Sequence, residues 1–291
     1  MARLAQGKAS RTARMTAALR HRHHLAGIRP LVFDDIYAGL FVDARSALMA
    51  VPTPVGDWLF GSVLGPVRGL EGEVLARSRY VEDVLDAKLT EGLTQIIVLG
   101  AGFDTTGLRH AAKGLRIFEV DHPATQTEKR AILSRHAELA KDIVFVPVDF
   151  AKDDLVTALD AAGFDPAQPA LVSWLGVTMY LAEVIVLATL AQLRTRLSSG
   201  SEIVFDAYPH PDRAPANERA LFALTRAATA SQGEPMTGWF NATTFPVLVA
   251  GTGWSLTEMI DGAEMRARWF KGQPKIIHPP VGAAFCRLAV A

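Results

Sequence analysis

The chain has 291 residues, and its 30 lysines and arginines balance 30 aspartates and glutamates, so the formal net charge is zero. This balance favours neither nucleic acid nor an anionic membrane as a partner, and neither a secretory signal peptide nor a membrane-spanning apolar run is apparent. The single cysteine, Cys286, excludes an internal disulfide framework and fits the reducing cytoplasm, where we expect the protein.

The N-terminal region is predicted to be helical. Ser10 can cap a helix that runs to about Leu25. His21, His23 and His24 lie near its end, and a metal site is one interpretation. Basic residues also complement the dipole at a helix C-terminus, and no cysteine or acidic cluster completes a ligand set, so we predict no metal.

A second long helix is predicted over residues 69–89, and it carries Arg77 and Arg79 shortly before the first core strand. Two solvated arginines are the simplest interpretation. The functional alternative is that one of them binds a ligand carboxylate, which the planar guanidinium group suits.

The apolar run from Ile96 to Leu99 predicts a buried parallel strand. It ends at Gly100-Ala101-Gly102, and a helical pattern follows, which is the opening unit of a doubly wound nucleotide-binding fold. Gly100 and Gly102 lack a Cβ, so the backbone can pass close to a ligand there.

A second strand, residues 115–121, ends in acidic residues. Glu119 and Asp121 follow Gly100 by 19 and 21 residues. An acidic residue about 20 positions past the first glycine can accept hydrogen bonds from ribose hydroxyls. The sequence therefore predicts an adenosine-type ligand at the carboxyl ends of the first two strands, with Asp121 as the residue that binds its ribose.

Apolar strands alternate with helical segments along the rest of the chain. Five further strands are predicted near residues 143–148, 169–174, 201–207, 253–260 and 281–289, and four helices near 104–112, 123–140, 153–162 and 182–197. This alternation predicts an α/β fold with a mostly parallel seven-stranded sheet. Residues 211–240 are predicted to be helical and, with the N-terminal helices, to form a cap.

We expect four segments: a helical cap and lead-in over residues 1–92, a Rossmann-like core over 93–210, a helical cap insertion over 211–245, and C-terminal strands over 246–291. The cofactor itself is less clear from the residues alone. The third glycine of a dinucleotide fingerprint is replaced by Thr105, and no phosphate-loop ending is present. S-adenosylmethionine suits a glycine turn that does not demand a pyrophosphate.

Several motifs together resemble one family. They are residues 99–106 (Leu-Gly-Ala-Gly-Phe-Asp-Thr-Thr) with Arg109, 118–123 with Lys129, 146–150, 162–165, 174–181, 200–201, 205–206 and 233–235. The chain resembles the leucine carboxyl methyltransferase-like family of S-adenosylmethionine-dependent O-methyltransferases from about Ser10 onward. The resemblance implies a Rossmann-like class I methyltransferase fold with an antiparallel last strand.

The resemblance also implies roles for individual residues. It places the arginine for the methionine carboxylate of the cofactor at Arg77 rather than Arg79. It favours an adenine contact for Asp149 and Phe150 after the third strand, although an aspartate there is also a common helix cap. Leu175 occupies a position where the family often has a cofactor-binding glutamate, which puts that contact in doubt.

The sequence therefore predicts a cytoplasmic O-methyltransferase with S-adenosyl-L-methionine as cofactor and a small-molecule acceptor. Such a transfer is an in-line displacement that mainly needs alignment and a dry pocket. No general base stands out, which mildly favours a carboxylate acceptor over a hydroxyl. Tyr180 is expected to pack or to line the pocket, and Cys286 to be a buried thiol. The alternatives are an NAD-linked oxidoreductase and a cofactor-binding protein without turnover. The sequence does not indicate an oligomeric state.

Overall fold

The computed structural model describes residues 11–50, 52–55, 58, 69–110, 114–150, 152–210, 212, 214–231, 233–241 and 244–290. Its centre is a seven-stranded sheet in the order β3-β2-β1-β4-β5-β7-β6. The strands are β1 (Gln95–Leu99), β2 (Arg116–Asp121), β3 (Ile143–Pro147), β4 (Leu171–Trp174), β5 (Glu202–Ala207), β6 (Trp254–Asp261) and β7 (Ala284–Val290). The first five strands pair in parallel, and β7 is antiparallel to both β5 and β6. The predicted sheet, with its antiparallel last strand, is confirmed.

Both faces of the sheet are covered, which explains why the strands are continuously apolar rather than alternating. In β1, Ile97 and Leu99 belong to one core cluster, whereas Ile96 and Val98 belong to another on the opposite face. Cys286 on β7 lies in the first cluster and is fully buried. Burial raises the pKa of its thiol to about 12, as expected for a structural cysteine.

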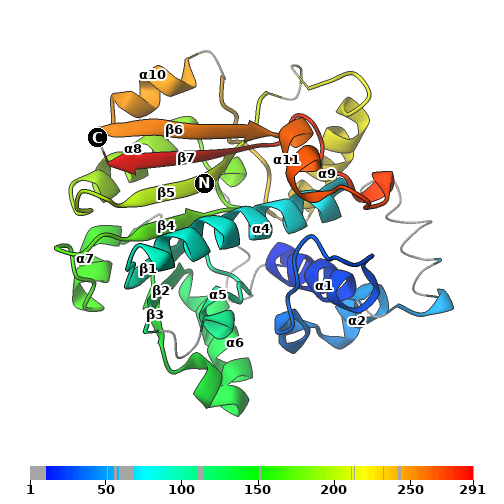
Figure 1. The fold of residues 1–291 in the computed structure, drawn as a ribbon, viewed down its shortest axis with the longest axis horizontal. Helices are drawn as coiled ribbons and strands as arrows, with labels where there is room; N and C mark the ends of the chain where they lie inside the picture. Colours follow the sequence, from blue (N-terminus) through cyan, green and yellow to red (C-terminus); the bar gives the residue numbers. More distant parts are fainter. Residues whose placement is uncertain are drawn as a thin grey trace.

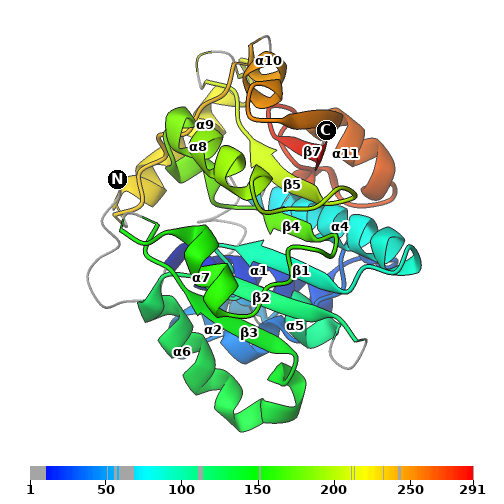
Figure 2. The same ribbon diagram turned by 90° about the vertical axis from the view of Figure 1, so that its left-hand side faces the viewer.

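The helices divide between the two faces (Figure 2). Residues of α7 (Leu155–Ala161), α8 (Glu183–Arg194) and α10 (Phe245–Ala250) belong to the first core cluster. Residues of α4 (Gly69–Thr90) and α11 (Gly262–Trp269) belong to the second. The other helices and 3₁₀ turns are α1 (Arg11–Ala26), η1 (Ala38–Phe41), α2 (Ala44–Ala50), α5 (Thr106–Arg109), α6 (Pro123–Leu133), η3 (Ser134–Ala140), η4 (Thr178–Tyr180), α9 (Arg219–Ser231) and η6 (Lys275–Ile277).

The helices α1 and α9 lie beyond one end of the sheet (Figure 1). Strands β5 and β6 are both antiparallel to β7, so they run in the same direction, and β1 to β4 run parallel to β5. The arrow of β6 points toward α1 and α9 in Figure 1. The carboxyl ends of the parallel strands therefore face α1 and α9. Ligands of open parallel sheets bind at this edge.

Three predicted helices are shorter in the structure. Within residues 211–240 the described helix is only Arg219–Ser231, because Gly233 takes a positive φ of 83° and Pro235 cannot continue a helix. The helix predicted over 123–140 ends at Leu133, and a 3₁₀ segment broken at His136 follows. The helix predicted at 104–112 is a single turn, with residues 111–113 outside the described part. The four-segment division stays a prediction. No helix of the described ranges has both the length and the apolar character that a bilayer crossing requires.

Candidate functional site

The glycine turn after β1 depends on two left-handed residues. Gly100 has φ +65° and Gly102 has φ +48°, which residues with a side chain rarely adopt. The N–H groups of Gly100 and Ala101 both donate to the carbonyl of Val120, at 2.8 and 3.1 Å. These bonds fix the turn against the end of β2.

Side chains from other parts of the chain pack closely against the glycine turn. A Cβ on Gly100 would overlap the Val177 side chain, and a Cβ on Gly102 would lie 3.0 Å from the Cβ of Ala13 on α1. The two glycines therefore allow α1 and the loop after β4 to approach the turn, in addition to any room they leave for a ligand.

Asp121 lies at the end of β2 and reaches back to the turn. Its carboxylate accepts hydrogen bonds from the Gly102 N–H and from the His122 N–H, the latter at 2.6 Å. Burial raises the pKa of Asp121, and these two N–H groups oppose the shift. A carboxylate has about four lone-pair sites. The remaining acceptor sites fit the two hydroxyls of a ribose.

Glu119, the other acidic residue of this motif, is placed differently. Its carboxylate is 2.7 Å from Nζ of Lys129 on α6, and both side chains are 1% exposed. Lys129 also donates to the Asp104 carbonyl at 2.7 Å. Burial raises the pKa of Glu119 to about 7 although Lys129 opposes the shift. This pair ties α6 to the sheet, so Asp121 is the ribose-binding candidate.

Arg77 and Arg79 lie in different environments. Arg79 pairs with Asp83 of its own helix at 2.6 Å, and its side chain is 42% exposed. Arg77 is largely buried and lies against Gly176 after β4, where a Cβ would be 2.7 Å from Nη1. Its ion pair with Glu73 is 4.0 Å long, beyond hydrogen-bond range, so the guanidinium group fits a cofactor carboxylate. That role for Arg77 stays a prediction.

Asp149 and Phe150 follow β3 at the same edge of the sheet. The carboxylate of Asp149 is 2.7 Å from Nζ of Lys152, which is 77% exposed. Phe150 is partly buried against the first core cluster. Their predicted contact with adenine is compatible with this position and stays a prediction.

Leu175 is partly buried and packs against the second core cluster. An apolar side chain at this position is thereby stabilised by the core. The hydrogen bond that a glutamate would offer the cofactor is absent at Leu175.

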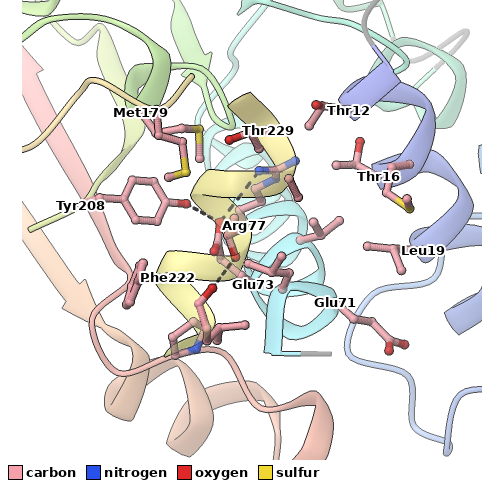
Figure 3. A pocket seen from close by; sticks show the side chains of 18 of the residues that line it. Thr12, Thr16, Leu19, Glu71, Glu73, Arg77, Met179, Tyr208, Phe222 and Thr229 are labelled. Atoms are coloured by element: carbon pink, nitrogen blue, oxygen red, sulfur yellow. Dashed lines mark hydrogen bonds and ion pairs between the residues drawn. The ribbon is translucent and has the colours of Figure 1, made fainter. Parts of the chain in front are cut away.

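A cavity of about 190 Å³ adjoins Arg77 (Figure 3). Its walls come from α1, α4, α9 and η4, and most of the lining surface is carbon. Aliphatic, thioether and aromatic side chains dominate: Met15, Leu19, Leu70, Val74, Met179, Leu221, Phe222 and Met236. Tyr180 is also part of the wall, which agrees with its expected role.

Three of the polar lining groups, those of Glu73, Arg77 and Tyr208, lie together at one side of this cavity. The Tyr208 hydroxyl donates to Oε1 of Glu73, and Figure 3 shows Tyr208 pointing at Glu73 with Arg77 beside it. Behind them Asp206, fully buried, accepts from the Gly176 N–H at 2.6 Å and from the Thr178 hydroxyl at 2.8 Å. Burial raises the pKa of both Glu73 and Asp206, and Arg77 opposes both shifts.

Glu73 and Tyr208 were not among the residues predicted from sequence. The available signals were weak: Glu73 is one helical turn before Arg77, and Tyr208 follows the carboxyl end of β5. Neither pattern shows that the two side chains meet.

Helix α1 is fixed to the glycine turn by a buried polar network. Arg20 donates to Asp35 and to the Phe103 carbonyl, both at 2.7 Å, and Thr105 donates to Asp35 at 2.8 Å. Burial would raise the pKa of Asp35, but the charges of Arg20 and Arg109 outweigh it and lower the pKa. The network holds α1 where it can line the cavity.

Two of the three histidines of α1 make local contacts. His23 is buried and its Nε2 accepts from the Val32 N–H at 3.1 Å, while His24 pairs with Asp34 at 2.5 Å. Burial lowers the pKa of His23 to about 4. Elsewhere in the described part of the chain, Glu82, Asp86 and His110 bring ligand atoms together. Glu82 there already pairs with Arg109 at 2.7 Å and His110 at 2.9 Å.

Comparison with solved structures supports the fold. The chain is similar to a DUF574 family protein from Streptomyces avermitilis, with a TM-score of 0.61 and 15% identity over 99% of this chain and all of that one. A structure from Thermobifida fusca, titled as a provisional methyltransferase, gives a TM-score of 0.59 at 16% identity over 99% of this chain and 96% of that one.

Sequence comparison identifies relatives with a shared name. YktD of Bacillus subtilis is 27% identical over 89% of this chain and 91% of its own length. A Rhodococcus jostii protein is 32% identical over 63% of this chain and 62% of its own length. Both carry the provisional name of an S-adenosyl-L-methionine-dependent methyltransferase.

A sequence model described as leucine carboxyl methyltransferase matches residues 13–194. The match spans the glycine turn, Asp121, Arg77 and the loop after β4, which are the features that form the candidate site. The chain therefore belongs to the leucine carboxyl methyltransferase family, whose members transfer methyl groups from S-adenosyl-L-methionine.

Proposed function

We propose that the protein is an O-methyltransferase that methylates a carboxylate or hydroxyl oxygen of a small, largely apolar metabolite by direct in-line displacement. The observation that supports it best is the apolar cavity, because it lies beside Arg77 at the carboxyl edge of the sheet. S-adenosyl-L-methionine, when bound, supplies an activated methyl group.

The protein's own residues would hold and orient the two reactants. Asp121 binds the ribose hydroxyls, Asp149 and Phe150 contact adenine, and Arg77 binds the methionine carboxylate. The side chains of α1 and α9 exclude water from the acceptor cavity. Such positioning supplies a large part of the rate enhancement in displacement reactions.

The neutral formal charge supports a small-molecule acceptor over nucleic acid or a membrane surface, and the cytoplasm stays the proposed compartment. Family membership does not support the NAD-linked alternative. Binding without turnover is an outcome that the experiment below can identify.

Calorimetry with S-adenosyl-L-methionine, S-adenosylhomocysteine and NAD, on wild type and Asp121→Ala, tests the cofactor site. We expect both sulfur ligands to bind, NAD not to bind, and the variant to lose at least about tenfold in affinity, because hydrogen bonds to charged groups contribute about 1.5–3 kcal/mol. Methyl transfer is then measured with a panel of small acids and phenols. Absence of sulfur-ligand binding contradicts the proposal, and binding with no turnover on any acceptor supports a non-catalytic protein.

A further inference from the structure

Glu73 is a buried acidic residue in the wall of the acceptor cavity. It is 5% exposed and lies one turn before Arg77 on α4, so both side chains share one face of the helix. Its Oε1 accepts from the Tyr208 hydroxyl, and Arg77 is 4.0 Å away. A buried carboxyl group is costly unless it is paired or functional.

The charges around Glu73 are not balanced. The groups that face it are Arg77 on its own helix, Asp206 on β5, Tyr208 after β5 and Tyr180 on η4. Two carboxyl groups thus surround a single guanidinium group. Asp206 is occupied by the Gly176 N–H and Thr178, whereas Glu73 borders the cavity.

This arrangement discriminates between acceptor groups. A carboxylate acceptor would add a further negative charge to this poorly hydrated site, beyond Glu73, Asp206 and the cofactor carboxylate proposed for Arg77, and like charges in close proximity repel one another. A hydroxyl acceptor can instead donate a hydrogen bond to Glu73. The cavity of about 190 Å³ also limits size. For comparison, an engineered apolar cavity of about 150 Å³ binds benzene.

We propose that the acceptor group is a hydroxyl on a small apolar molecule of about one aromatic ring, and that Glu73 is the catalytic base that takes its proton. This inference rests on the proposed function. The acceptor oxygen forms its bond to the methyl carbon as the carbon–sulfur bond breaks toward sulfur. The hydroxyl proton passes to the Glu73 carboxylate and later to solvent, while Tyr208 holds that carboxylate in place.

Two matched probes test this assignment by calorimetry on protein saturated with S-adenosylhomocysteine. Para-ethylphenol and para-methylbenzoate are similar in size but differ in charge. In wild type we expect para-ethylphenol to bind at least tenfold more tightly. In Glu73→Gln we expect para-methylbenzoate to bind at least tenfold more tightly than it does in wild type, because the variant removes the negative charge.

Methyl transfer to para-ethylphenol is the second readout. Glu73→Gln should lower it by about 10²–10⁴-fold, the usual contribution of a general base. S-adenosylhomocysteine affinity should not fall, because the variant removes a negative charge beside Arg77 and leaves the guanidinium group in place. The matched control is Asp86→Asn, an exposed acidic residue of the same helix, which should change neither measurement.

Each other outcome overturns the proposal. It is wrong if wild type binds the benzoate as tightly as the phenol, if neither probe binds, or if Glu73→Gln transfers methyl to the phenol at the wild-type rate. The wild-type selectivity decides the question even if the variant does not fold. Failure of S-adenosylhomocysteine to bind wild type would instead contradict the proposed function.

Discussion

The two halves of the candidate site are built in different ways. The cofactor end, at the carboxyl ends of β1 to β3, is made of backbone turns and of acidic residues close to them in sequence. The acceptor cavity is made of side chains from α1, α4, η4 and α9, which are far apart in the chain. Backbone geometry leaves a pattern in local sequence, whereas a cavity depends on packing between distant segments.

Each half also contains a buried glutamate, and the two glutamates differ in their distance from a cation and in their contact with the acceptor cavity. Glu119 at the cofactor end has a cation at 2.7 Å, and it is not part of the wall of the acceptor cavity. Glu73 has its nearest cation at 4.0 Å and borders a cavity. The first arrangement stabilises the fold, and the second leaves a carboxyl group available to a ligand. Four predictions test this comparison of the two halves.

The largest expected effect follows removal of the cation beside Glu119. Lys129→Met should lower the free energy of unfolding by about 3–5 kcal/mol, because it leaves the buried Glu119 carboxyl group without its partner, either charged or forced to take up a proton. Urea unfolding at pH 7.5 measures the loss. The double variant Glu119→Gln/Lys129→Met should recover much of it. Glu73→Gln, which can still accept from Tyr208, should change stability by less than about 1 kcal/mol. An equal loss at both positions would contradict the contrast.

Helix α1 borders both halves, and its buried His23 predicts an acid sensitivity. The folded pKa is lowered to about 4, so the unfolded chain binds the proton more readily. Stability should be fully present above about pH 6.5 and fall as the pH drops toward 4, by at most about 3 kcal/mol. When unfolding is measured across this pH range, the free energy of unfolding of His23→Gln should fall less with acidification than that of wild type. The exposed His136→Gln should keep the wild-type slope, and an unchanged slope in His23→Gln would count against the assignment.

Gly176 lies where the two halves meet, and Gly176→Ala should affect both stability and cofactor binding. Its φ of +78° costs a side-chain-bearing residue about 1–3 kcal/mol. The new Cβ would also displace Arg77, so we expect at least about a tenfold loss of S-adenosylhomocysteine affinity. Gly92→Ala is the control, because it has φ +91° and no atom within 4 Å of the added Cβ. Calorimetry showing equal affinities for the two variants would exclude Arg77 from cofactor binding.

The smallest effect is expected at the outer rim of the cofactor end. Lys152→Ala removes an exposed partner of Asp149 and should leave the free energy of unfolding nearly unchanged, because solvent screens such a pair. S-adenosylhomocysteine affinity should stay the same, whereas Asp149→Ala should weaken it severalfold. If Lys152→Ala alone weakens binding, the ion pair rather than the Asp149 carboxylate serves the cofactor.

The cofactor end was predictable because its chemistry is local. The strand before Gly100, the glycine turn and the acidic end of the second strand lie within about 25 residues, and the family motif covers them. The sequence analysis assigned the ribose to Asp121, but the pairing of Glu119 with Lys129 was not predictable, since it depends on packing under the sheet. The cavity could not be predicted, because it forms where Glu73, Tyr208 and Phe222 come together from distant parts of the chain. The hydrophobic periodicity within one helix or strand does not show such a contact. The helix predicted over 211–240 was too long because the prediction passed over the stop signals at Gly233 and Pro235.

Helix α1 has one further consequence. Ala13 lies over Gly102 at the cofactor end, whereas Thr12, Met15 and Leu19 line the acceptor cavity. The two ligands therefore share a wall, and any shift of α1 on binding one of them changes the free energy of binding the other. Thermodynamic reciprocity then sets a strict equality: the factor by which S-adenosylhomocysteine changes the affinity for para-ethylphenol must equal the factor by which para-ethylphenol changes the affinity for S-adenosylhomocysteine.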